Sequence, residues 1–90
     1  MDAPIEEAKF LVRSKNRVDV LRLLAGERHT RASLAAATGA SQATLGRILE
    51  DFVDRSWVRR DAAGYVTTAT GELVADGVSD LLSVLELESE

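Results

Sequence analysis

The chain has 90 residues, 46% of them hydrophobic, which fits one small globular domain. It has no cysteine, no apolar run near the roughly 20 residues that span a bilayer, and no signal pattern at its start, so we expect a cytoplasmic protein without disulfides or thiolate metal sites. The net charge of −4 would by itself argue against nucleic-acid binding.

The charges are unevenly distributed along the chain. All 11 basic residues lie between Lys9 and Arg60, where five acidic residues leave a net +6. The first eight residues carry −3 and residues 61–90 carry −7. A basic middle between acidic ends is typical of a polar module that reads DNA.

The first elements are predicted as two helices. Residues 5–13 have Pro4 near their start and acidic residues in the first turn, with Ile5, Ala8 and Val12 on one face. Asn16 is a candidate cap for a second helix over residues 17–25, which would bury its leucines. Residues 27–29 are expected to be a short extended piece.

Residues 30–55 have the pattern of a helix-turn-helix. Thr30 is expected to cap a short helix that Gly39 ends in a left-handed conformation, and Ser41 is expected to cap a second helix. The apolar side of this second helix is formed by Leu45, Ile48, Leu49 and Phe52. Because only residues 39–41 separate the helices, they must cross steeply, which is the geometry whose second helix can enter a DNA major groove.

The pattern changes from helical to alternating after residue 55. Two β-rich segments, 57–61 and 65–69, flank a loop at residues 62–64, which predicts a hairpin. Thr70 is expected to cap a final helix over residues 71–88. That helix has a broad apolar stripe that we expect to form a homodimer interface, although it would equally serve to cover its own domain: Leu73, Val74, Val78, Leu81, Leu82 and Leu85.

This order of elements, in which the sequence of residues 13–21 opens the helix before the helix-turn-helix, resembles winged helix-turn-helix transcription regulators of the ArsR/MarR-like type. The acid excess and the presence of only two lysines resemble the haloarchaeal members. The resemblance implies a mainly α fold with a small β-hairpin wing, in which a three-helix core carries N-terminal and C-terminal helices. We expect residues 1–90 to be a single DNA-binding domain, with the helix-turn-helix at 30–55, the wing at 57–69 and the last helix at 71–88. The abrupt end of that apolar helix is also compatible with one domain of a longer regulator.

The resemblance implies sequence-specific binding of double-stranded DNA as a dimer and control of transcription, usually as a repressor. The recognition helix 41–55 would enter the major groove and the wing would contact the backbone or minor groove. Polar and basic side chains of the helix-turn-helix and wing are therefore candidate DNA contacts, against the alternative of an ordinary solvated surface: Arg28, Arg31, Ser41, Gln42, Ala43, Thr44, Arg47, Arg59 and Arg60. Gly46, which costs a helix about 1 kcal/mol relative to alanine, needs a reason such as close approach to the groove or to another helix.

Other functions have less support. His29 is the single histidine and has no cysteine beside it, so no metal or other cofactor is expected. The acidic residues Glu50, Asp51 and Asp54 follow the spacing of a helix surface rather than that of an acid/base pair, and no catalytic arrangement is present. Near DNA they would repel phosphate, so we expect their end of the helix to point away from the backbone. The alternative function is a winged-helix module that binds protein, as an assembly subunit without DNA binding, which the acidic ends favour.

Overall fold

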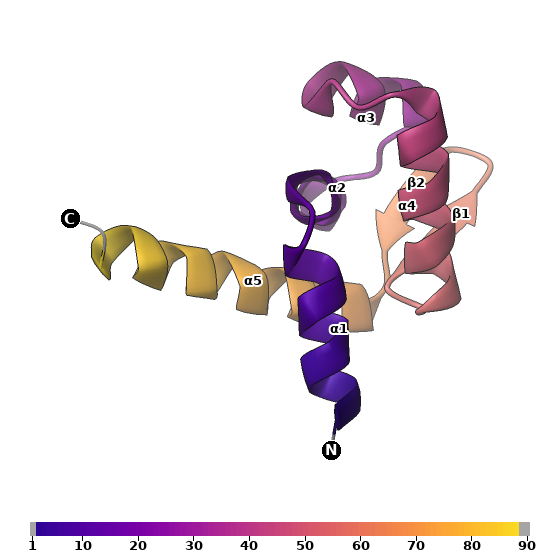
Figure 1. Cartoon of the computed structure of the whole chain (residues 1–90). Coiled ribbons are helices and arrows are strands. Elements are labelled where there is room, and N and C mark those ends of the chain that lie inside the picture. The colour runs from indigo at the N-terminus through magenta and orange to yellow at the C-terminus, as the bar shows by residue number, and fades with distance from the viewer. Residues whose placement is uncertain (1, 89–90) are drawn as a thin grey trace.

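The computed structural model describes the backbone of residues 2–88 and the side chains of residues 6–85. It contains five helices and one hairpin, as predicted (Figure 1). The elements in chain order are α1 (Asp2–Val12), α2 (Lys15–Gly26), α3 (Arg31–Thr38), α4 (Gln42–Asp54), β1 (Val58–Asp61), β2 (Gly64–Thr67) and α5 (Ala69–Glu88). None of these described helices is both long enough and apolar enough to cross a membrane.

Helix α2 is the central element, because it contacts α1, α3, α5 and β2. Its side chains Val20, Leu21 and Leu24 are fully buried. Val18 is only partly buried against the same core. Ser14, not Asn16, caps this helix, since the Ser14 hydroxyl accepts a hydrogen bond from the N–H of Arg17 and Asn16 lies inside the first turn.

The helix-turn-helix is built by the local signals seen in the sequence. Gly39 has φ of +75°, and its N–H donates to the carbonyl of Ala35 at 2.8 Å, which ends α3. Ser41 then caps α4 by accepting from the N–H of Thr44 at 3.1 Å. The four predicted apolar side chains of α4 are all buried, which fixes the opposite side of the helix toward solvent.

The wing is an antiparallel hairpin, in which Val58 pairs with Thr67 and Asp61 with Gly64. His29 adds a single bridge to Tyr65, with backbone hydrogen bonds of 3.0 and 2.8 Å, so the expected extended piece before α3 is confirmed. Gly64 is required at this bridge, because it has φ of +131° and a Cβ there would lie 2.5 Å from the carbonyl oxygen of His29. The wing is thus tied to the residues that begin α3.

The strands are shorter than predicted. Trp57 precedes β1 and lies in the core together with Tyr65, as expected for aromatic residues beside a packed sheet. Residues 68 and 69 do not belong to β2. Thr68, not Thr70, caps α5, since the Thr68 hydroxyl accepts from the N–H of Gly71 at 3.0 Å, and the helix consequently begins at Ala69.

Helix α1 buries a different face from the one predicted. Leu11 is buried and Phe10 is half-buried, whereas Ala8 and Val12 are exposed; the side chain of Ile5 lies outside the described residues. The Phe10 ring lies between two guanidinium groups, with Arg55 Cζ at 3.6 Å and Arg17 Cζ at 4.0 Å from its centroid. The cation–π contacts of Arg17 and Arg55 stabilise the rotation of α1 that turns Phe10 toward the other helices.

The same contacts join α1 to the end of α4. Arg55, the C-cap residue of α4, donates from Nε to Glu7 Oε2 at 2.9 Å. Arg17 donates to the carbonyl of Phe10 at 2.7 Å. We call this group of Glu7, Phe10, Arg17 and Arg55 the α1 clasp.

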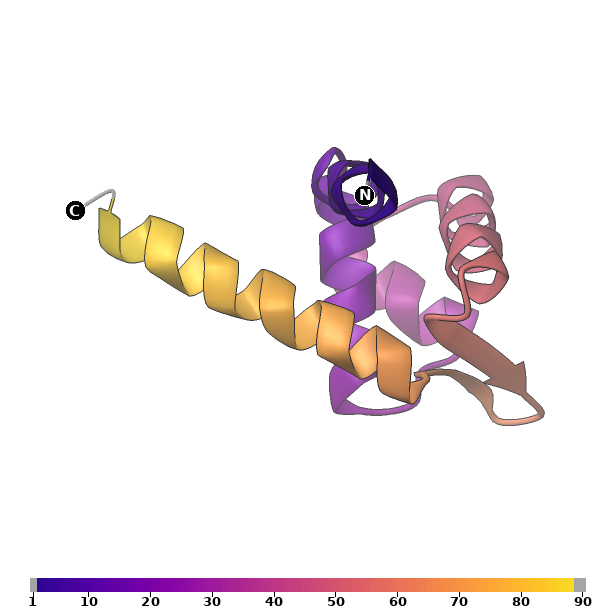
Figure 2. The ribbon, with the colours of Figure 1, turned by 90° about the horizontal axis from the view of Figure 1, so that it is seen from below.

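Helix α5 starts against the wing and then projects from the other helices as a long rod (Figures 1 and 2). Its first turn packs so closely on the segment before β1 that a Cβ on Gly71 would overlap the carbonyl oxygen of Trp57. Ala75 is buried and Val78 is partly buried, while the C-terminal half extends beyond the core.

Candidate nucleic-acid interface

The outward side of α4 has a polar first half. Gln42, Ala43 and Arg47 are exposed, and they line one shallow concavity with Arg31 and Gly46. Because the apolar side of α4 is held in the core, these side chains face solvent together. The N-terminal part of α4 is thus open to solvent, and its contact with base edges stays a prediction.

Ser41 and Thr44, two of the predicted contact residues, form hydrogen bonds that cap the start of α4. The hydroxyl of Ser41 accepts from the N–H of Thr44 and donates to the hydroxyl of Thr44 at 3.0 Å. Thr44 is accordingly half-buried, whereas Ser41 is exposed. Both residues therefore fix the start of the helix, and neither lines the concavity.

Gly46 has a neighbour that the sequence did not reveal. The guanidinium of Arg31, the first residue of α3, lies over Gly46, with Nη1 3.6 Å from where a Cβ would stand. The three nearest atoms outside α4 all belong to this side chain, so the approach of a second helix to Gly46 is made by Arg31. Arg31 thus belongs to the surface of α4 as well as to the start of α3.

The wing carries two exposed arginines, Arg59 and Arg60. Strand alternation predicts that they point to opposite sides, yet both are accessible because only Val58 of β1 is buried. Arg60 lies 5.8 Å from the Tyr65 ring centroid and, with Arg31, lines a hollow between α4 and the wing. Arg60 is therefore placed beside the outward side of α4, whereas Arg59 is exposed on the wing without lining that hollow.

Arg28 has a partner within the chain. Its Nη2 lies 2.6 Å from Asp61 Oδ2 at the wing tip, so it anchors the wing to the segment before α3. Asp61 also accepts from the N–H of Ala63 at 2.9 Å and thereby shapes the hairpin turn. The backbone hydrogen bond from Ala63 and, after it, the Arg28 guanidinium hold the pKa of Asp61 below its ordinary value. The Asp-Ala-Ala-Gly sequence of this turn was a usable signal for Asp61, whereas nothing local pointed to Arg28.

The second half of α4 is acidic. Glu50 and Asp54 are exposed, Asp51 is half-buried, and all three line the same concavity as Arg31 and Arg47. The outward side of α4 is therefore polarised, basic and neutral at its start and acidic toward its end. No two of these groups form an ion pair within 4.0 Å among the described side chains.

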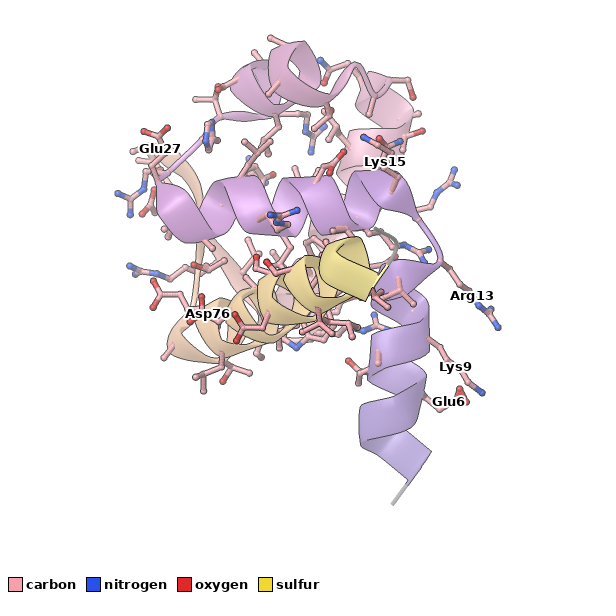
Figure 3. The ribbon with its side chains drawn as sticks, turned by 90° about the vertical axis from the view of Figure 1, so that its left-hand side faces the viewer. Glu6, Lys9, Arg13, Lys15, Glu27 and Asp76 are labelled. Atoms are coloured by element: carbon pink, nitrogen blue, oxygen red, sulfur yellow. The ribbon has the colours of Figure 1, made fainter. Side chains whose placement is uncertain are left out.

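The apolar side chains predicted for α5 fall into two groups. Val74, Val78 and Leu82 are half-buried against their own chain, whereas Leu73, Leu81 and Leu85 are about half exposed or more. An open groove of about 420 Å³ runs between α1 and α5, with mostly apolar walls and Trp57 among its lining residues. The charged residues Glu6 and Lys9 of α1, and Arg13 directly after it, point away from α5 (Figure 3). The apolar edge of α1 and the exposed edge of α5 thus lie beside each other.

His29 has a structural setting. Its Nδ1 lies 2.8 Å from Ser33 Oγ, and its backbone pairs with Tyr65. In the part of the chain that the structure describes, no group of three or more histidine, cysteine, aspartate or glutamate residues could hold a metal ion.

Comparison with known proteins identifies the family. The family model described as the HVO_A0261 N-terminal domain matches residues 5–90. No curated protein sequence matches the chain.

Among solved structures, the MarR family protein Rv2887 from Mycobacterium tuberculosis superposes with a TM-score of 0.76 at 17% identity, covering 99% of this chain and 81% of that one. The adhesin competence repressor AdcR from Streptococcus pyogenes gives 0.67 at 17% identity, covering 98% and 75%. HlyU from Vibrio cholerae gives 0.65 at 17% identity, covering 90% and 97%. At such identities the likeness shows the fold, and the expected resemblance to MarR/ArsR-like and haloarchaeal regulators is confirmed. The chain belongs to the HVO_A0261 N-terminal domain family and has the winged-helix fold seen in MarR-type regulators.

Proposed function

We propose that the chain binds double-stranded DNA sequence-specifically and regulates transcription as a single winged-helix domain. Helix α4 would lie in the major groove, and the β1–β2 wing would lie on the backbone or in the adjacent minor groove. The observation that carries the proposal is the exposed first half of α4, where Gln42, Ala43 and Arg47 are free of core packing and flanked by basic side chains. Glutamine and arginine are the side chains that pair bidentately with adenine and guanine.

The basic groups of the proposed interface are available for contacts with DNA. Arg31, Arg47 and Arg59 have no ion pair with any described residue, and Arg60 has only its neighbouring Tyr65 ring. A phosphate contact therefore does not have to break an existing pair at these positions. Arg28 is different, because its bond to Asp61 makes it a support for the wing, and a phosphate contact there would compete with that carboxylate.

The acidic half of α4 gives the orientation of the proposed complex. Anions are favoured at the start of a helix, where the N–H groups after Ser41 point outward, and disfavoured at its end. Glu50, Asp51 and Asp54 strengthen this asymmetry by repelling phosphate. The start of α4 would therefore lie deepest toward the DNA, and the acidic end would lie away from the backbone.

The second part of the proposal is a homodimer through α5. Leu73 is 73% exposed and Leu81 49% exposed on a helix that extends past its own core, and contiguous exposed apolar side chains of this kind mark interaction sites. A second copy would cover these side chains and would place two recognition helices on successive half-sites of a palindromic duplex. Repression by occluding a promoter fits this arrangement, and AdcR, which shares the fold, is described as a repressor.

The same apolar edge favours one alternative, a winged-helix module that binds another protein without binding DNA. The two proposals are separated by selection of bound duplexes from a random library, followed by anisotropy measurements across a salt series. We expect one enriched motif and an affinity that falls linearly in a logarithmic plot against salt, with a slope set by the number of phosphates contacted.

A matched pair of variants makes the test specific. Arg47→Ala removes a side chain from the proposed interface, whereas Arg22→Ala removes an exposed arginine that lines the groove between α2 and α5. Only the first should weaken binding. No enriched motif, or equal losses in both variants, would favour the protein-binding module.

A further inference from the structure

Gly46 occupies the middle of the proposed recognition helix, where glycine is the least favourable residue apart from proline. Its neighbours on the outward side are Gln42 and Ala43 one turn earlier and Glu50 one turn later. The absence of a side chain leaves the helix surface bare at this turn. What fills the space is the Arg31 guanidinium.

The geometry of this contact is that of a flat group laid on the helix. Nη1, Cζ and Nη2 of Arg31 lie 3.6, 3.8 and 3.9 Å from the position that a Cβ of residue 46 would take. These nearly equal distances mean that the guanidinium plane faces the helix. Arg31 thus supplies the side chain that position 46 lacks, although it comes from the first residue of α3.

We infer that Arg31 is a specificity-determining residue that reads a guanine in the major groove, with Gly46 as the seat that positions it; this inference rests on the proposed DNA binding. An arginine at the start of the first helix of the motif would ordinarily be assigned a backbone contact. Here its charged end lies instead on the exposed side of α4 and lines both the concavity along that helix and the hollow toward the wing. Arginine presents two parallel donors that match the O6 and N7 acceptors of guanine.

The surrounding charges favour a base over a phosphate at this place. Glu50 and Asp54 line the same two hollows as Arg31. Their carboxylates would repel the full negative charge of a phosphate near the guanidinium more strongly than the partial charges of a neutral base edge. Neither carboxylate forms an ion pair with Arg31 within 4.0 Å, so among the described residues no partner has to be displaced.

The test uses four single variants and the duplex selected by the wild-type chain. Arg31→Ala should weaken binding to that duplex by about 10- to 100-fold and abolish the preference for guanine at one position in each half-site. On a duplex whose guanine there is replaced, the same variant should lose no more than about twofold. Arg31→Lys should behave like Arg31→Ala in base preference, because an ammonium cannot make the paired contact.

The substitutions at position 46 test the seat itself. Gly46→Ala places a methyl group at ordinary contact distance from the guanidinium and should keep the guanine preference. Gly46→Leu fills the space that Arg31 occupies and should remove the same preference that Arg31→Ala removes. The double variant Arg31→Ala/Gly46→Leu should show no further change in preference. Circular dichroism of each variant checks that the fold is retained.

Three outcomes would overturn the inference. Equal weakening of both duplexes by Arg31→Ala, with a salt slope smaller by about 1, would make Arg31 a phosphate anchor. Unchanged binding by Arg31→Ala would remove Arg31 from the interface while leaving the proposed function intact. Failure of the wild-type chain to select any duplex would overturn the proposed function, and this inference with it.

Discussion

Among the glycines of the chain, Gly71 lies closest to another segment of the fold, and substitution there should reveal how tightly α5 is packed. A Cβ on Gly71 would overlap the carbonyl oxygen of Trp57 and lie 2.8 Å from its carbonyl carbon and 3.2 Å from Thr67 Cβ. The oxygen is not free to move, because it also accepts from the N–H of Thr68 at 2.9 Å. Gly71→Ala must therefore shift the start of α5 or the strand ends.

The magnitude follows from two opposing terms. Overpacking against rigid atoms costs about 3 kcal/mol, the upper part of the usual range, since the obstructing atoms belong to the backbone. The gain in helix propensity returns up to about 1 kcal/mol. The net loss of about 2 kcal/mol should lower Tm by roughly 8–16 °C in a domain of this size.

The same helix provides the control. A Cβ on Gly77 would meet nothing within 4 Å in the chain, so Gly77→Ala should gain up to about 1 kcal/mol and raise Tm by a few degrees. Thermal unfolding followed by circular dichroism at two protein concentrations measures both variants and separates effects on association from effects on the fold. If Gly71→Ala proved as stable as Gly77→Ala, the reasoning from this close contact would be wrong.

Three further outcomes are expected. Arg47→Ala should cost about 1–3 kcal/mol of DNA binding and relax base preference, whereas Arg60→Ala should weaken all duplexes alike and reduce the salt slope by about 1; unchanged binding in both variants, measured by anisotropy, would remove these residues from the interface. The pKa of Asp61 is lowered in the fold, so its contribution to stability is fully present above the ordinary value of 3.8 and is lost as the pH falls through the lowered pKa. NMR titration of the Asp61 carboxyl should give a midpoint below 3.8, and Arg28→Ala should raise this midpoint in part. A midpoint at or above 3.8 in the wild-type chain would contradict the role of the Ala63 and Arg28 contacts. Light scattering after gel filtration should show a dimer for the wild-type chain and for Ser83→Glu but a monomer for Leu81→Glu, and a wild-type monomer at high concentration would refute dimerisation through α5.

The helix-turn-helix could be predicted because its determinants are local. Gly39 needs only its own positive φ, and Ser41 needs only the N–H three residues later. The apolar side of α4 is unambiguous because no alternative phase places as many large side chains together. The extended conformation before the capped helix was also predicted, but the bridge from His29 to Tyr65 was not, because Tyr65 is distant in the sequence.

Determinants that depend on distant residues were not predictable in the same way. Several rotations of α1 about its axis would bury apolar side chains. The contacts of Arg17 and Arg55 with the Phe10 ring favour one of these rotations, and Arg55 is 45 positions away from Phe10 in the sequence. At the start of α5, Thr68 and Thr70 are equivalent as sequence signals. The approach of Gly71 to Trp57 places the helix start so that only Thr68 can cap it.

The candidate site shows the same division. Exposure of Gln42 and Arg47 follows from the helical period alone, whereas the neighbours of a long side chain depend on the tertiary fold. Arg28 and Arg31 are three positions apart and look alike in the sequence, yet one is bound to Asp61 and the other lies over Gly46. The sequence identified Gly46 as anomalous but not the residue that explains it.

The α1 clasp gives the proposed dimer a way to fix the spacing of its recognition helices. Arg55 ends α4 and is bonded to Glu7 and stacked on Phe10, so the end of α4 cannot tilt without displacing α1. Helix α1 in turn shares an apolar groove with α5, the proposed dimer helix. The position of α4 in its own subunit is therefore set from both ends, by the clasp at its C-terminus and by the helix-turn-helix crossing at its N-terminus. A rigid connection of this kind is what reading two half-sites at one helical-turn separation requires, because a small rotation of α4 would move its side chains off the base edges.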